Sequence, residues 1–361
     1  LLAPYFSAYA YTGMCDFAGP VQTSLRELTG WGYGEYWFPE VRSLEGAMIM
    51  LTLVHYPYVY LLTRAAFLEQ SLCVLEVSRT LGCGPWQSFA RIALPLARPS
   101  IIAGLSLALM ETLADYGTVQ YFGVDTFTTG IFRTWFGLGD DAAAAQLAAL
   151  LMLFVFVLII MERWSRSRAR YHHTSQRYRQ PPGYQLTGWR AFLAFILCLL
   201  PLFLGFLLPV GQQLVWAIQT AGEMVDDSFI TLAWHSLALA AGASLLALLL
   251  ALFLGYGKRL CPSWMVTAAV RLSGMGYAVP GTVIAIGVMI PFAWLDNTLD
   301  AWFRANLGLS TGLILSGTLV ALLFAYMVRF LAVSLQTVEA ALGKIRPSVD
   351  DAARSLGRRP V

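Results

Sequence analysis

Two carboxylate residues, Glu111 and Asp115, lie near the end of an apolar stretch at residues 99–115. They are four residues apart, so on a helix both side chains project from one face. A carboxylate at membrane depth costs roughly 2.5–3.5 kcal/mol by insertion scales and is therefore a functional candidate by default. Two interpretations are open. The pair could offer oxygen contacts to a cation on a translocation pathway, or it could form hydrogen bonds around Gly117 and Thr118 at the membrane interface.

A third candidate for this pathway is Pro57, inside the apolar segment 46–67. Proline removes one backbone donor and can kink a helix. Such a kink could be the hinge of a gate. It could equally serve packing alone, because membrane helices tolerate proline.

The sequence contains no pattern for catalysis or for a resident metal. Gly343-Lys344 is followed by Ile345 and lacks the earlier glycine of a phosphate-binding loop. Neither HExxH nor GxSxG occurs. The adjacent His172 and His173 cannot share one helix face, and no CxxC pair links the scattered cysteines. We predict no catalytic residue, no metal site and no cofactor in this chain.

The segment from Leu75 to Ser100 carries the most specific pattern in the chain. Glu76 to Leu81 suits a short helix, and Gly82 is placed to end it with a left-handed cap. Pro85 can open a second helix, which Leu94-Pro95 is expected to end. A helix, a glycine turn and a second helix form a shape that can dock with a soluble partner.

These residues resemble the cytoplasmic motif of binding-protein-dependent ABC permeases, which reads Glu-Ala-Ala, three residues, Gly, nine residues, then Ile-x-Leu-Pro. The matching positions here are Glu76, Val77, Ser78, Gly82, Ile92, Leu94 and Pro95. Val77 and Ser78 stand where alanine is usual, and both are small enough for close packing. In that family the motif forms a coupling helix that sits in a cleft of the ATPase subunit.

A second copy of the motif lies near the C-terminus. Asp351, Ala352, Ala353 and Gly357 repeat the six-residue step from an acid to a glycine. Arg79-Thr80-Leu81-Gly82 is echoed by Arg354-Ser355-Leu356-Gly357, and the sequence stops at Val361 before an Ile-x-Leu-Pro part. Two docking motifs on one chain predict two permease halves that engage a dimeric ATPase.

Three longer stretches are similar to the fused two-half permeases of ferric-iron ABC importers: residues 55–70, 109–140 and 276–287. The resemblance implies a type I ABC importer fold and about two further spans at each end. It also implies a periplasmic ferric-binding protein and a separate ATPase that binds ATP and Mg. Sulfate, thiamine and polyamine permeases share the coupling motif, so the motif alone does not name the substrate. An ion-coupled secondary transporter would explain Glu111 but not the two motifs.

The composition indicates that the chain is an integral membrane protein. Of 361 residues, 58% are hydrophobic and 12% are charged, about half the charged share of a soluble domain. A net charge of +3 gives no basic face for nucleic acid. We predict an all-α polytopic protein with about eight transmembrane helices. The candidates are 1–15, 46–67, 99–115, 142–161, 190–211, 233–257, 274–294 and 309–331.

The distribution of basic residues predicts the orientation and the domain boundaries. One orientation leaves only Arg26, Arg42, Arg133 and Arg304 outside, so both motifs face the cytoplasm of a bacterial inner membrane. Six spans between the motifs make the two halves parallel repeats. The predicted parts are a first half at 1–161 with its coupling loop at 69–98, a linker at 162–189 whose arginines meet anionic lipid, and a second half at 190–361 with its coupling loop from about 332.

Overall fold

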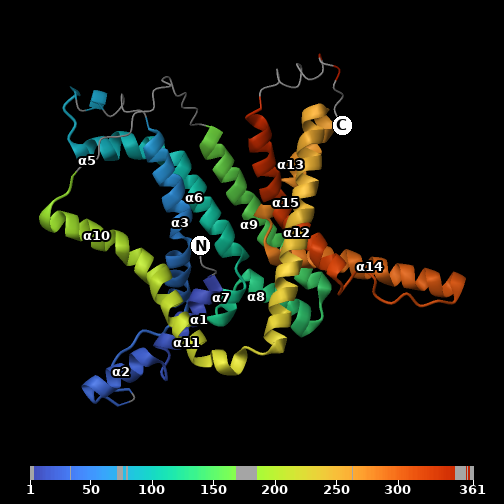
Figure 1. Ribbon diagram of the computed structural model, residues 1–361, viewed down its shortest axis with the longest axis horizontal. Helices are drawn as coiled ribbons and strands as arrows, with labels where there is room; N and C mark the ends of the chain where they lie inside the picture. The colour runs from blue at the N-terminus through green and yellow to red at the C-terminus, as the bar shows by residue number, and fades with distance from the viewer. Residues whose placement is uncertain are drawn as a thin grey trace. The chain divides into compact units, whose positions relative to one another are not determined.

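The computed structural model describes residues 4–32, 34–70, 76–78, 80–167, 185–261, 263–345, 355 and 357. Within these ranges the chain is helical and contains no strand, which confirms the all-α prediction (Figure 1). The long helices are α3 (Leu44–Glu69), α6 (Leu94–Ala114), α9 (Asp141–Ser167), α10 (Gly188–Leu202), α11 (Leu208–Met224), α12 (Asp227–Leu260), α14 (Gly281–Leu307) and α15 (Leu319–Gly343). Shorter ones are α1 (Pro4–Cys15), α2 (Pro20–Thr29), α5 (Pro85–Ser88), α7 (Gly117–Tyr121), α8 (Phe127–Phe132) and α13 (Trp264–Ser273).

Seven helices in the described ranges are long and apolar enough to cross a membrane. They correspond to seven of the eight predicted spans. The eighth, at residues 1–15, is the 12-residue helix α1, which is shorter than the roughly 20 residues that a span needs. The seven are 44–68, 85–114, 141–164, 188–222, 227–260, 281–307 and 319–343.

The helix that opens at Pro85 does not end at Leu94-Pro95, contrary to the prediction. It continues without a break to Ala114. A π-helical turn, η1 (Phe89–Ala93), joins α5 to α6, and the Leu94 N–H donates to the Phe89 carbonyl. Pro95 then falls in the first turn of α6, where its missing N–H costs little.

The contacts divide the chain into two compact units. The first holds residues 1–130 and 153–222, and the second holds residues 131–152 and 223–361. The division of the sequence into halves at 161 and 190 follows the repeated motif and stays a prediction. The contacts group α10 and α11 with α1 and α3.

The first unit packs α1, α3 and α7 around the buried ring of Phe122. α6 runs beside α3 (Figure 1). The two backbones approach closely at Gly104, where an added Cβ would lie 2.7 Å from the Val59 Cα. Small residues are the usual means of close helix approach in membranes.

A long helix, in which the π-helical turn η3 (Phe203–Leu207) joins α10 to α11 without a break, completes the first unit. The Tyr11 hydroxyl donates to the Leu204 carbonyl at 2.6 Å. Gly205 lies against the carbonyl oxygen of Leu53. That carbonyl is four residues before Pro57, so proline leaves it without its usual helical donor. Pro57 therefore lies where the α10–α11 helix packs on α3.

The second unit is built on α12 and α15, which run side by side (Figure 1). Small residues at helical spacing on α12 form the contact face: Ala243, Ala247, Ala251 and Gly255. Met327, Leu335 and Val338 of α15 pack against this face. Small residues of this kind let two membrane helices approach closely.

Two aspartates of α14 fasten the loop that follows it. The carboxylate of Asp296, which is 1% exposed, accepts hydrogen bonds from the N–H groups of Ile314, Leu315 and Ser316 and from the Ser316 hydroxyl at 2.6–3.2 Å. One turn later, Asp300 accepts from the Thr311 N–H at 2.8 Å and pairs with Arg304 at 2.6 Å. These bonds hold the loop against the helix.

Hydroxyl and carboxylate caps start the long helices. Ser43 accepts from the Gly46 N–H at the start of α3, and Thr318 accepts from the Val320 N–H at the start of α15. Asp226 accepts from the Phe229 N–H at 2.8 Å at the start of α12. That hydrogen bond, with one from Ser228, lowers the pKa of the exposed Asp226 carboxyl.

Candidate coupling site

The first copy of the motif forms an elbow, which we define as residues 76–93 where described. Residues 76–78 and 80 are helical, and Gly82 has a φ of 82°, in the left-handed region. The Leu81 N–H donates to the Val77 carbonyl and the Cys83 N–H donates to the Ser78 carbonyl, both at 3.0 Å. These bonds end the short helix in the way a glycine cap does. Gly84 then precedes Pro85, which opens α5.

The outer surface of the elbow is apolar. Leu81 is 78% exposed and Trp86 is 82% exposed, and Val77 is also exposed. The Trp86 ring meets the Phe89 ring edge to face, with centroids 6.3 Å apart. Exposed leucine and tryptophan side chains at a turn are typical of a surface that a protein partner covers.

The inner surface of the elbow is polar and buried. The Ser78 and Ser88 hydroxyl oxygens lie 2.7 Å apart, and both residues are buried. At the end of α3, the Gln70 side-chain amide donates to the Ala93 carbonyl at 2.7 Å. The pattern of the sequence alone gave no signal for either hydrogen bond.

The remaining positions of the first motif share the continuous helix that follows. Ile92 is half-buried in η1, and Leu94 and Pro95 are exposed at the start of α6. Glu76 is exposed on the short helix. The structure therefore brings all seven positions of the first motif onto one elbow and the first turn after it.

The second copy of the motif lies largely outside the described residues, including Asp351, Ala352 and Ala353. Gly357 is described and has a φ of 76°. Two basic residues at the end of α12 bind α15, the helix that leads to this motif. Lys258 pairs with Glu339 at 2.6 Å, and the Arg259 guanidinium donates to the Leu342 carbonyl at 2.6 Å, near the C-terminus of α15.

The two predicted pathway carboxylates, Asp115 and Glu111, have different surroundings in the structure. Asp115 follows α6 and accepts hydrogen bonds from the Thr118 N–H at 2.9 Å, the Thr118 hydroxyl at 3.0 Å and the Val119 N–H at 3.3 Å. It thus shapes the first turn of α7. Glu111 is half-buried in the last turn of α6. A role for either residue, or for Pro57, in moving a cation stays a prediction.

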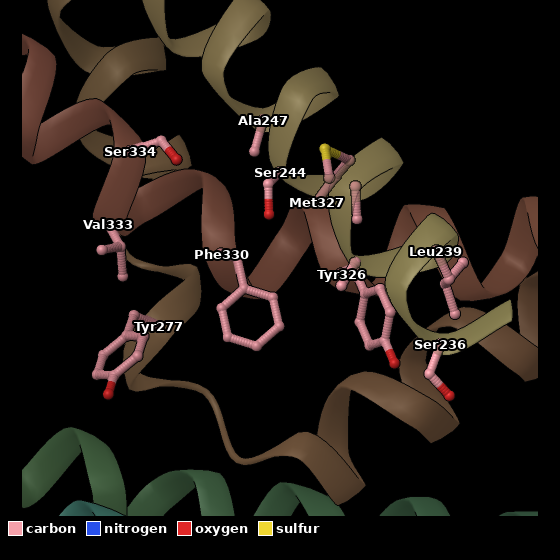
Figure 2. A pocket seen from close by; sticks show the side chains of 12 residues that line it. Ser236, Leu239, Ser244, Ala247, Tyr277, Tyr326, Met327, Phe330, Val333 and Ser334 are labelled. Carbon is pink, nitrogen blue, oxygen red and sulfur yellow. The ribbon is translucent and has the colours of Figure 1, made fainter. Parts of the chain in front are cut away.

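A pocket of about 710 Å³ lies between α12 and α15 in the second unit. Figure 2 shows its lining, which comes from α12, from α15 and from the turn that carries Tyr277. Phe330 and Ser334 line it. They come 275 residues after His55 and Val59, which is also the separation between Gly82 and Gly357 of the two motif copies. In the first unit, His55 and Val59 face α6.

The contacts of α6 define that face. The Thr112 hydroxyl lies 3.3 Å from the His55 Nδ1 atom, and Gly104 approaches Val59. The pocket therefore lies on the face of α15 that corresponds to the α6-facing side of α3. This pocket could not be predicted from the sequence, because it depends on how α12 packs against α15.

Comparison with known proteins finds a family match over part of the chain. Residues 33–171 match the family described as binding-protein-dependent transport system inner membrane component. Among curated relatives, the Fe(3+)-transport system permease protein FbpB 2 of Haemophilus influenzae is 24% identical over 321 residues, which are 87% of this chain and 60% of that protein. The ferric transport system permease protein FbpB of Actinobacillus pleuropneumoniae is 23% identical over 87% of this chain and 46% of that protein.

A shorter match involves another group of permeases. The molybdenum transport system permease protein ModB of Escherichia coli is 26% identical over 137 residues, which are 35% of this chain and 60% of that protein. The chain spans about half the length of the ferric permeases it matches. No solved structure matches it. With seven span-capable helices in its described part, this is a multi-pass inner membrane protein whose residues 33–171 match the family of binding-protein-dependent transport system inner membrane components.

Proposed function

We propose that the protein is the permease subunit of an ABC importer that moves ferric iron across the bacterial inner membrane by alternating access. The observation that carries this proposal is the elbow at residues 76–93. Its left-handed Gly82 and its exposed Leu81 and Trp86 form a surface fitted to a protein partner. The similarity to two ferric permeases over 87% of the chain supports the cargo.

The energy for transport would come from a separate ATPase dimer that binds ATP and Mg. When the dimer closes, it would displace the elbow and the second motif around Gly357. Rigid-body movement of the attached helices would then open the pathway to the other side. A periplasmic ferric-binding protein would deliver the cargo to the outer loops.

Uptake into proteoliposomes tests the cargo. The full-length protein, reconstituted with its ATPase, is given radioactive ferric iron on a ferric-binding protein, with and without internal ATP. The proposal expects ATP-dependent uptake of iron. Uptake of iron without ATP would contradict the ABC mechanism and favour an ion-coupled transporter.

A second candidate cargo is molybdate, which the match to molybdenum permeases over 35% of the chain favours. The same vesicles are given labelled molybdate on a molybdate-binding protein. ATP-dependent uptake of molybdate without uptake of iron would keep the class of transporter and overturn the iron assignment. Sulfate, thiamine and a polyamine, each on its own binding protein, complete the comparison.

A further inference from the structure

The elbow contains a hydrogen bond that the family motif does not predict. Ser78 stands where alanine is usual in the resembling motif, and its hydroxyl oxygen lies 2.7 Å from that of Ser88. The two residues are only 1% and 6% exposed. They belong to the two arms of the elbow, the short helix and α5, and the turn at Gly82 separates them.

Side chains do little to restrict the backbone of the turn between these arms. Gly82 and Gly84 both lie in open space, with no heavy atom within 4 Å of an added Cβ. Glycine leaves the backbone more conformational freedom than any other residue. A hydrogen bond across the turn fixes the angle between the two arms, which the glycines would otherwise leave adjustable.

A second link ties the elbow to the membrane helices. The Gln70 amide, at the end of α3, donates to the Ala93 carbonyl at the end of η1 at 2.7 Å. The Phe67 ring of α3 contacts the Phe89 ring of η1, with centroids 5.8 Å apart. Because η1 continues into α6, any displacement of α5 reaches both α3 and α6.

We infer that Ser78 and Ser88 are positioning residues that make the elbow rigid, so that movement of the ATPase is passed to α3 and α6. This inference rests on the proposed function. Neither serine touches cargo or nucleotide in this role. Without the hydroxyl pair, the ATPase would move the outer arm of the elbow while the turn bends, and ATP would be hydrolysed with less transport.

The test measures cargo transported per ATP hydrolysed by the full-length protein with its ATPase and binding protein. The variants are Ser78→Ala, Ser88→Ala and the double variant. A buried hydrogen bond contributes about 1 kcal/mol net, so we expect each single variant to lose about fivefold in this ratio. The double variant should lose less than the product of the two single losses, since both single variants remove the same bond.

Thr231→Ala is the matched control. Thr231 lies in α12, outside the elbow, and is exposed, and its hydroxyl donates a local hydrogen bond to the Asp227 carbonyl at 2.8 Å. This variant should keep the unsubstituted ratio. A rescue variant, Ser78→Cys with Ser88→Cys in a background without Cys73 and Cys83, should regain coupling on oxidation and lose it on reduction.

Three results would overturn the inference. They are unchanged ratios in the serine variants, additive losses in the double variant, and a lower amount of assembled complex with an unchanged ratio. In each of these cases the unsubstituted complex still couples, so the proposed function stands. If the unsubstituted complex shows no ATP-dependent transport, the proposed function fails and the positioning role fails with it.

Discussion

Gly82 and Gly357 lie 275 residues apart and share a left-handed backbone, with φ values of 82° and 76°. The same separation relates Ser43 to Thr318, the hydroxyl caps at the start of α3 and α15. A helix start and a glycine turn thus recur in one register. This register supports two copies of a single unit, a membrane helix followed by a docking motif.

The left-handed backbone of Gly82 gives the first prediction. In Gly82→Val, a β-branched side chain is forced into a region that costs L-residues roughly 1–2 kcal/mol or more. We expect the variant to insert into the membrane normally and to lose stimulation of its ATPase. Gly84→Val is the control, because Gly84 has a φ of −66° and open space. Normal stimulation in Gly82→Val would contradict the role of this turn.

The packing of the α10–α11 helix on α3 gives the second prediction. A methyl group at Gly205 would collide with the backbone carbonyl of Leu53, so Gly205→Ala should destabilise the protein by about 1–3 kcal/mol. Gly211→Ala, in the same long helix with open space around it, should be neutral or slightly stabilising. Thermal unfolding in detergent measures both. Equal melting temperatures for the two variants would show that this helix does not pack on α3 at Gly205.

The buried carboxylate of Asp296 gives the third prediction. Asp296→Ala removes the acceptor for the N–H groups of Leu315 and Ser316. Hydrogen bonds to a charged group are among the stronger ones, so exchange of these two amides with deuterium should become about 10- to 100-fold faster. The exposed Thr298 on the same helix provides the control, Thr298→Ala. Unchanged exchange in Asp296→Ala would show that the loop is held by other contacts.

The contrast between Asp115 and Glu111 gives the fourth prediction. Asp115→Ala removes the acceptor for the first turn of α7 and should lower thermal stability by about 1–3 kcal/mol. Glu111→Gln keeps the size of the side chain and its capacity for hydrogen bonds, so it should lower stability less than Asp115→Ala does. If Glu111 contacts the passing cation, this variant should still slow uptake of iron. Unchanged uptake with unchanged stability would remove Glu111 from the pathway.

Much of the fold could be predicted from local sequence. Apolar length identified seven of the spans, and the rule that glycine ends helices identified the turn at Gly82. The continuous helix through Pro95 could not be predicted, because a π-helical turn at 89–93 moves the proline to a tolerant position. The usual sequence rules end a helix at proline, and they do not predict π-helical turns.

The contacts between distant residues could not be predicted either. The Ser78–Ser88 bond spans a turn whose geometry depends on two glycines, and its two hydroxyls carry no periodic signal. The close approach of Gly205 to Leu53 joins residues more than a hundred positions apart. To predict this contact, one would also need to know that Pro57 leaves the Leu53 carbonyl without its usual helical donor. The capping role of Asp115 was among the interpretations because Thr118 follows it at a typical spacing.

The central claim is that this chain couples a ferric-binding protein to an ATPase. The most direct test is the rate of ATP hydrolysis by the full-length protein reconstituted with its ATPase, with the binding protein either iron-loaded or empty. The proposed function predicts a higher rate with the loaded form alone. Equal rates with loaded and empty forms, together with a response to a molybdate, sulfate, thiamine or polyamine receptor, would contradict the ferric assignment.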